Sequence, residues 1–217
     1  MKKLVNIFLL ATIPFSLLAQ PAPKDKAADK LLNTISARYK KFKSIKADFT
    51  YHIESKADNG QEKQRGVIFI KNNKFKLDIA GQIIICDNAN IWTYSKEVNE
   101  VQISTYNPKQ ATIRLEDIFT MYDKGFLYKI VEEKKDAGKE LVVVELTPKD
   151  KKKSFFKIKL TIDKTNQTIL KSVVYDKNGT THTYTITNQY PNVKLEDKFF
   201  SFDPKKYPGI EVIDLRN

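Results

Sequence analysis

The chain has 217 residues, of which 29% are charged and 11% are aromatic, a composition typical of a globular protein and not of a disordered one. Lys and Arg (38) outnumber Asp and Glu (26), for a formal net charge of +12. Cys86 is the only cysteine, which excludes an intramolecular disulfide, so the fold must depend on its hydrophobic core.

Residues 1–19 have the pattern of a secretory signal peptide. Two lysines precede an apolar run from Leu4 to Leu18, and the small residue Ala19 follows it. The run is short for a membrane span and contains Pro14. We predict cleavage after Ala19 and, because no cysteine follows the cut, a soluble exported protein without a lipid anchor of its own. In an exported chain, the positive charge favours anionic lipid headgroups or acidic proteins as partners over nucleic acid.

The first element after this segment is an amphipathic helix over residues 25–42. Two acidic residues, Asp25 and Asp29, stand near its start, as suits a helix N-terminus. The apolar positions recur at helical spacing: Leu31, Leu32, Ile35, Tyr39 and Phe42. This stripe predicts that one side of the helix packs on a sheet.

Short apolar runs separated by turn residues then predict a meander of antiparallel strands. In residues 74–79, Phe75, Leu77 and Ile79 alternate with charged residues, so one face is apolar and the other is charged. The expected strands are 45–55, four runs within 66–94, 98–105, 126–133, 139–147, 154–163, 168–175 and 180–189, with a closing piece at 210–213. We predict one α+β domain over residues 20–217, built on a curved sheet with an apolar concave side.

A helical insert interrupts the strands between residues 107 and 125. Leu115, Ile118, Phe119 and Tyr122 follow the i, i+3, i+4, i+7 pattern. Such an insert cannot lie within the sheet, so it must cover a face or an opening. Two helices over roughly ten strands suggest an enclosed cavity. Periodicity does not separate residues that line a cavity from residues of a filled core.

Catalytic chemistry finds little support. The two histidines, His52 and His182, are far apart in sequence, and each is expected to be a polar residue on the outer face of a strand. No metal-ligand, nucleophile or phosphate-loop motif is present. Cys86 is expected to be a small buried hydrophobe. The basic run 149–153 is interpreted as a charged hairpin loop, with docking to an acidic partner or an anionic membrane as the alternative.

Several segments together resemble the periplasmic outer-membrane lipoprotein carrier family, the LolA type. They span most of the chain after the leader: 42–49, 66–77, 87–94, 200–204 and 209–214. Two departures stand out. Lys71 takes the place of the arginine that bonds the helical lid in that family, and lysine lacks the planar donor fork. Asn72 and Asn88 take the places of a proline and of a turn glycine.

The resemblance implies an incomplete β-barrel of about 11 strands, whose helices cover an apolar concave face that shields the acyl chains of a lipoprotein. It implies a monomeric carrier in the periplasm with no cofactor, which takes acylated lipoproteins from an inner-membrane lipoprotein-releasing ABC transporter and passes them to an unidentified outer-membrane acceptor. The candidate lining or lid residues are Phe69, Phe75, Leu77, Ile79, Trp92, Leu115, Ile118 and Phe119. Lys71 is the candidate lid latch. The pattern leaves open which face Phe69 and Trp92 occupy.

Three other interpretations stay open. The first keeps the fold but changes the cargo to another lipid, such as a glycolipid or a pigment precursor. The second is a structural β-protein whose core is filled. The third, an exported hydrolase, finds least support, because no pair of nucleophile and base can be named.

Overall fold

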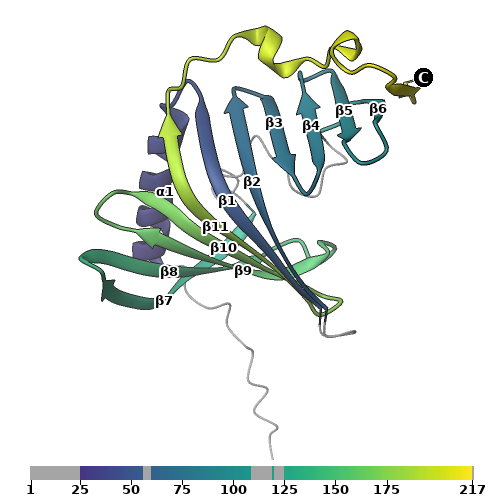
Figure 1. Ribbon diagram of the computed structural model, residues 1–217. Helices are drawn as coiled ribbons and strands as arrows, with labels where there is room; N and C mark the ends of the chain where they lie inside the picture. Colours follow the sequence, from purple (N-terminus) through teal and green to yellow (C-terminus); the bar gives the residue numbers. More distant parts are fainter. Residues whose placement is uncertain (1–24, 56–59, 109–118, 120–124, 217) are drawn as a thin grey trace, which may run out of the picture.

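The computed structural model describes residues 25–55, 60–108, 119 and 125–216 (Figure 1). Within them lie one α-helix, α1 (Lys26–Lys40), and two short 3-10 helices, η3 (Asp197–Phe200) and η4 (Pro204–Lys206). The strands are β1 (Ile45–Ser55), β2 (Gln61–Lys71), β3 (Lys74–Ile79), β4 (Gln82–Cys86), β5 (Asn90–Ser95), β6 (Glu100–Thr105), β7 (Phe126–Asp136), β8 (Lys139–Pro148), β9 (Phe155–Asp163), β10 (Thr168–Asp176), β11 (Thr180–Pro191) and β12 (Glu211–Asp214).

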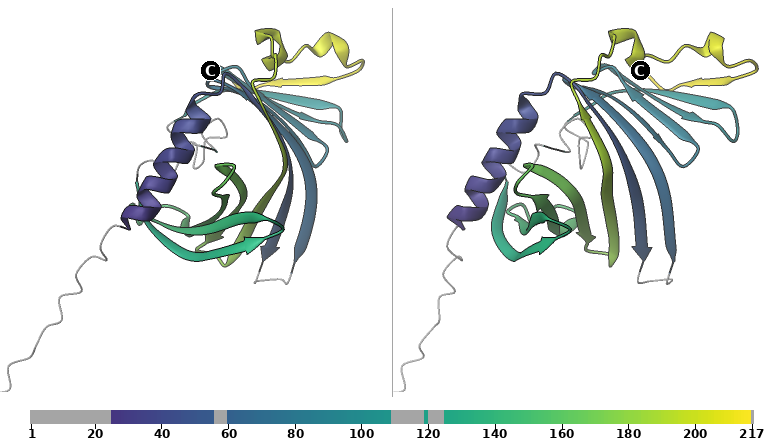
Figure 2. Two further views of the ribbon diagram at one scale, coloured as in Figure 1. Left: turned by 90° about the vertical axis from the view of Figure 1, so that its left-hand side faces the viewer. Right: turned by 60° about the vertical axis from the view of Figure 1, so that its left-hand side comes forward.

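All twelve strands belong to one sheet, in the order β12-β6-β5-β4-β3-β2-β1-β11-β10-β9-β8-β7. The sheet is strongly curved and remains open, with α1 lying across its concave side (Figure 2). The predicted curved, incompletely closed antiparallel sheet is therefore confirmed. One pairing differs from the expectation: the closing piece β12 runs parallel to β6, because a long C-terminal segment carries the chain across the sheet before it pairs.

Left-handed backbone positions at the turns explain why this sequence makes hairpins. Asn72 joins β2 to β3 with φ 53°, and Asn88 joins β4 to β5 with φ 79°. Asparagine is among the few non-glycine residues that adopt this conformation at low cost. The two asparagines that depart from the family pattern are thus compatible with the tight turns seen here. The basic run 149–153 forms the exposed connection between β8 and β9.

Helix α1 begins at a well-defined cap. One carboxylate oxygen of Asp25 accepts hydrogen bonds from the N–H groups of Ala27 (2.9 Å) and Ala28 (3.0 Å), and the other accepts from the N–H of Ile130 in β7 (2.9 Å). These bonds, the Ile130 bond above all, lower the pKa of Asp25. The cap therefore starts the helix and also ties it to the sheet. Among the described residues no helix is both long and apolar enough to cross a membrane.

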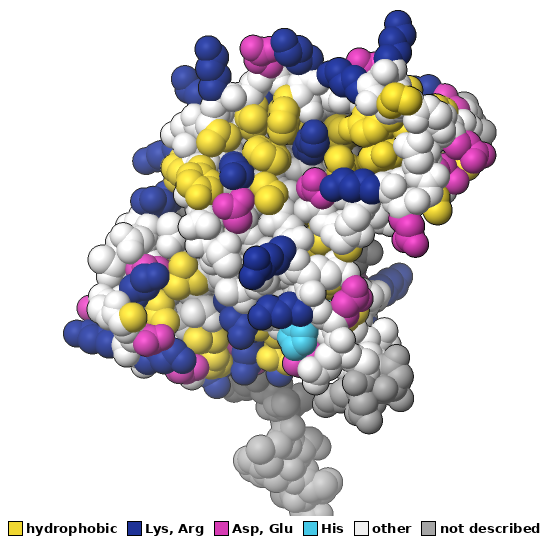
Figure 3. Space-filling model, in the orientation of Figure 1, with side chains coloured by type: hydrophobic (Ala, Val, Ile, Leu, Met, Phe, Trp, Pro, Cys, Tyr) yellow, Lys and Arg dark blue, Asp and Glu magenta, His cyan; other side chains and the backbone are white. Residues whose placement is uncertain are grey.

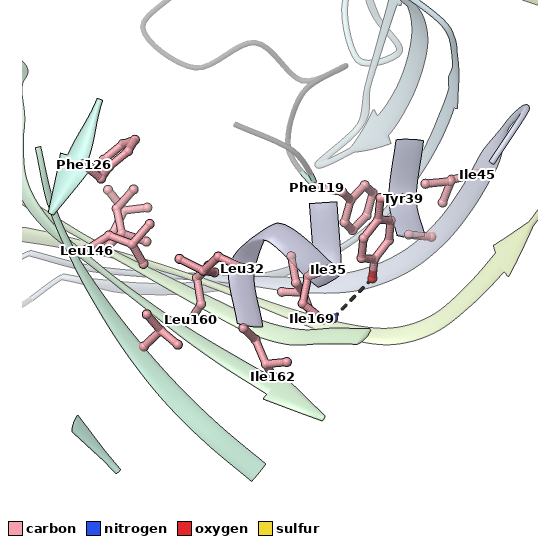
Figure 4. Close-up of a cluster of buried hydrophobic side chains, with 14 of the residues drawn as sticks. Leu32, Ile35, Tyr39, Ile45, Phe119, Phe126, Leu146, Leu160, Ile162 and Ile169 are labelled. Carbon is pink, nitrogen blue, oxygen red and sulfur yellow. Dashed lines mark hydrogen bonds between the residues drawn. The ribbon is translucent and has the colours of Figure 1, made fainter. Parts of the chain in front are cut away.

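The apolar stripe of α1 packs into the larger of two hydrophobic clusters. Leu32, Ile35 and Tyr39 are almost fully buried against strands of the concave face (Figure 4). The Tyr39 hydroxyl donates to Oε1 of Gln189 (2.5 Å) and accepts from the N–H of Ile169 (3.2 Å), and Nε2 of Gln189 donates to the Ile169 carbonyl (2.7 Å). This closed ring of three hydrogen bonds fixes the helix over β10 and β11.

A second cluster lies on the opposite, convex face. After β11 the chain passes through η3 and η4 and covers strands β3 to β6 (Figure 1). The cluster consists of Ile83, Ile85, Tyr94, Val101, Phe200 and Phe202, with Phe69, Trp92, Leu195, Phe199, Tyr207 and Ile210 packed against it. In the space-filling view, hydrophobic side chains gather in this upper part of the face among Lys and Arg side chains (Figure 3). Strands β4 and β5 are therefore apolar on both faces.

Candidate ligand-binding cavity

The concave face holds a cavity of about 250 Å³. Five strands, β1, β2, β3, β10 and β11, contribute to its wall, together with one residue of the segment between β6 and β7. The lining residues are Ala47, Phe49, Tyr51, Ile68, Leu77, Ile79, Phe119, Ile169, Ser172, Tyr184 and Ile186. Eight of these eleven side chains are hydrocarbon only, so the cavity offers its contents an apolar wall.

A glycine shapes one corner of this wall. A Cβ atom at Gly66 of β2 would lie 2.5 Å from Cζ of Phe49 on the neighbouring strand β1. The missing side chain leaves the space in which the Phe49 ring lies. The ring of Phe49 in turn lies 6.4 Å from that of Tyr184, so these aromatic residues bound the cavity on the β1–β11 side.

Polar groups stand at one end of the cavity. Tyr51 and Tyr184 are paired across β1 and β11, with their rings stacked at 5.0 Å. Burial raises the pKa of Tyr51, and it raises the pKa of Tyr184 to about 12, so both hydroxyls stay protonated at neutral pH. A hydrogen bond joins the Tyr51 hydroxyl to Nδ1 of His182 (2.6 Å), whose Nε2 lies 3.4 Å from a carboxylate oxygen of Asp176.

The two histidines, His52 and His182, lie on opposite faces of the sheet. His52 lies on the outer face beside Glu54, as expected. The expectation for His182 is wrong, because this residue shares the concave face with Tyr51. Tyr51 and Asp176 give its ring polar partners there, which makes a histidine on this face physically acceptable.

Of the residues that the sequence singled out for lining or lid, the structure places three in the cavity wall: Leu77, Ile79 and Phe119. Phe119 is buried and stacks on Tyr39 of α1, with ring centroids 4.8 Å apart (Figure 4). Phe75 is buried in the same hydrophobic cluster. Leu115 and Ile118 lie outside the described residues.

Phe69 and Trp92, also expected in the lining, lie on the convex face. The ring of Phe69 is 4.9 Å from that of Phe199, and Trp92 packs in the same second cluster. The reason is that the C-terminal segment covers this face and needs apolar partners on it. Lys71 also belongs to this side: its ammonium donates to the Leu195 carbonyl (2.8 Å) and to Asp197 (2.8 Å).

The larger part of the wall consists of residues that no sequence pattern marks as cavity lining. Ala47, Phe49 and Tyr51 alternate along β1, which is consistent with one shared face, but this pattern alone gives no reason to place them beside a cavity. On β11, Tyr184 and Ile186 alternate within a threonine-rich strand whose apolar face is weakly marked. The cavity depends on the curvature that brings β1, β3 and β10 around one space.

Comparisons with known proteins agree with this architecture. The model of the family described as "Outer membrane lipoprotein carrier protein LolA" matches residues 40–203. An uncharacterized conserved protein from Thermus thermophilus has a similar structure, with a TM-score of 0.57 at 11% identity over 87% of this chain and 99% of that chain. LprF from Mycobacterium bovis has a TM-score of 0.50 at 13% identity, over 80% and 96% of the two chains.

A further similar structure is a LolA superfamily protein from Nitrosomonas europaea, with a TM-score of 0.44 at 14% identity over 81% of this chain and 98% of that chain. No curated protein matches the sequence. At these identities the structural likeness describes the fold alone.

Proposed function

Because the chain belongs to the outer membrane lipoprotein carrier family LolA, we propose that it binds the acyl chains of lipoproteins and carries them through the periplasm from the inner to the outer membrane. The donor in this proposal is the inner-membrane lipoprotein-releasing ABC transporter, and the acceptor lies in the outer membrane. Residues 1–19 direct export, residues 20–217 form one carrier domain, and the protein acts as a monomer.

The observation that supports this function is the apolar cavity on the concave face. Burial of each CH₂ group is worth about 0.8 kcal/mol, so an acyl chain of about fifteen methylenes gains roughly 12 kcal/mol when it leaves water completely. Side chains such as Leu77, Ile169 and Ile186 supply a hydrocarbon surface for such a chain. A carrier of this kind needs no catalytic group and no cofactor.

Native mass spectrometry of the protein purified from a periplasm in which it is expressed tests the proposal. We expect adducts with the masses of acylated lipoproteins. The variant Ile79→Glu places a charge on the half-buried wall of the cavity and should reduce the adduct population strongly, because a carboxylate beside an acyl chain loses its hydration. The matched control is Leu127→Glu on β7, where the side chain is 45% exposed.

The outcomes separate the candidate functions. Lipoprotein adducts in the wild type and in Leu127→Glu, with loss in Ile79→Glu, support the carrier. If the adducts instead have the mass of another lipid, and are again retained in Leu127→Glu and lost in Ile79→Glu, that lipid is the cargo. A wild-type protein that carries nothing and takes up neither added lipoprotein nor added lipid would overturn the proposal.

A further inference from the structure

Three hydroxyl side chains form one row across the wall of the cavity. Tyr51 on β1 pairs with Tyr184 on β11, and Tyr184 pairs with Ser172 on β10. All three line the cavity and, among its described lining residues, they are the ones with polar side chains. The next pair along β1 and β11, Phe49 and Ile186, is apolar. Sheet register therefore gathers the hydroxyls into a single band.

The row lies at one end of the cavity. Along β1 the lining residues follow in the order Ala47, Phe49, Tyr51, so the hydroxyls come last in the direction of the β1–β2 connection. Ala47 packs in the buried cluster that also includes Phe119, whereas Tyr51 is half-buried. An elongated ligand that lies along β1 would thus meet hydrocarbon at one end and hydroxyl groups at the other.

The members of the row differ in their hydrogen bonds. The Tyr51 hydroxyl is held by His182, which itself lies against Asp176. The hydroxyls of Tyr184 and Ser172 make no hydrogen bond to any residue that the structure describes. Their capacity to donate and accept is therefore available to a molecule inside the cavity. Burial and the nearby charge of Asp176 keep the pKa of Tyr184 high, so its hydroxyl remains a neutral donor.

Among the described residues, two carboxylates act on the tyrosines at this end. In addition to burial, the charge of Asp176 raises the pKa of both tyrosines, and the charge of Glu62 raises the pKa of Tyr51. Both carboxylates therefore oppose a further negative charge at this end. The same field disfavours an anionic ligand group, whereas an uncharged group meets no charge–charge repulsion there. An ester carbonyl is an uncharged acceptor, so the hydroxyls of the row can donate to it without adding charge to this end of the cavity.

We propose that the row of Tyr51, Tyr184 and Ser172 binds the uncharged ester groups of an acylated glycerol, while the acyl chain lies along the apolar wall. This inference rests on the proposed function, since it assumes that acyl chains enter the cavity. It adds a polar subsite that favours an acyl chain esterified to glycerol over a free fatty acid.

Binding of two probes to the purified full chain tests the subsite. The probes are 1-palmitoylglycerol and palmitate, which share the acyl chain and differ in the charge of the polar end. Displacement of a fluorescent acyl probe gives the two affinities. We expect the wild type to prefer 1-palmitoylglycerol, and Tyr184→Phe combined with Ser172→Ala to reduce that affinity about tenfold, the effect of one to two hydrogen bonds. Palmitate affinity should change less than about twofold, because the charge of Asp176 opposes the approach of its carboxylate to the row.

Two further variants sharpen the test. Tyr190→Phe removes a hydroxyl from an exposed tyrosine on the same strand and should leave both affinities unchanged. Asp176→Asn removes the carboxylate near the row and should increase palmitate affinity. If the double variant binds 1-palmitoylglycerol as the wild type does, the subsite is overturned while acyl carriage stands. If the folded wild type binds neither probe nor any lipoprotein, both the proposed function and the subsite fail.

Discussion

The ammonium of Lys71 lies 2.8 Å from a carboxylate oxygen of Asp197, although the two residues are 126 positions apart in the sequence. Lys74 reaches the other carboxylate oxygen at 3.2 Å, and Lys71 also donates to the Leu195 carbonyl. The hairpin between β2 and β3 thus binds the start of η3. This contact holds the C-terminal segment where its aromatic residues can cover the convex face.

Replacement of Lys71 by methionine should loosen this segment, because it removes the ion pair and the bond to Leu195 while keeping most of the aliphatic stem. Trp92, the only tryptophan, is half-buried in the second cluster and reports on the change. We expect a red-shifted tryptophan emission and a modestly lower Tm. Lys71→Arg keeps the charge and serves as control. An unchanged emission in Lys71→Met would show that the segment is held without this lysine.

The same contact should depend on pH in a defined direction. Hydrogen bonds from Lys71 and Lys74 lower the pKa of Asp197 from its ordinary value of 3.8. A lowered pKa in the folded state means that the stabilisation is complete above pH 3.8 and is lost as the pH falls through the lower value. The wild type should therefore exceed Asp197→Asn in stability near neutral pH.

Thermal unfolding of the two proteins between neutral pH and strong acid measures this difference. Because the other carboxylates titrate equally in both proteins, the difference in Tm isolates Asp197. We expect the difference to shrink toward zero in acid. A difference that stays constant across the whole range would rule out an ionic contribution of Asp197.

Two neighbouring strands differ in how well their sequences predict which side chains share a face. In β3, charged residues alternate with Phe75, Leu77 and Ile79, and this alternation suffices to place the three on one face. In β4 the run Ile83, Ile84 and Ile85 has no polar member. The pattern therefore cannot show which of these side chains face the concave side. Both sides are apolar because the C-terminal segment covers the convex side, which would otherwise be exposed to solvent. The positions of Phe69 and Trp92 could not be predicted for the same reason.

The helix and the cavity show a similar contrast. The cap at Asp25 and the stripe of α1 are local signals, and the observed helix, Lys26–Lys40, lies within the expected residues 25–42. The row of Tyr51, Tyr184 and Ser172 joins three strands, two of which follow more than a hundred residues after the first. Its existence depends on register and curvature, which no local pattern encodes.

Gly66→Ala should reduce the uptake of acyl chains. A Cβ atom 2.5 Å from Cζ of Phe49 forces the ring to move, and the ring borders the cavity. Overpacking of this kind costs about 1–3 kcal/mol of stability. We expect a fluorescent acyl probe to bind the variant more weakly than the wild type, while the circular dichroism spectrum of the variant stays native. Phe49→Leu in the Gly66→Ala background restores the space and should recover uptake; if it does not, the defect has another cause.

Tyr39→Phe isolates the hydrogen bonds that hold α1 over the sheet. The ring can keep its stacking on Phe119, but the N–H of Ile169 loses its hydroxyl acceptor in a buried position, and Oε1 of Gln189 loses its donor. A buried polar group left unsatisfied costs about 1–3 kcal/mol, and we expect the free energy of unfolding to fall by that amount. Chemical denaturation of Tyr39→Phe beside Tyr190→Phe, whose side chain is 43% exposed, measures it. Equal stability of the two variants would mean that apolar packing alone holds the helix over the cavity.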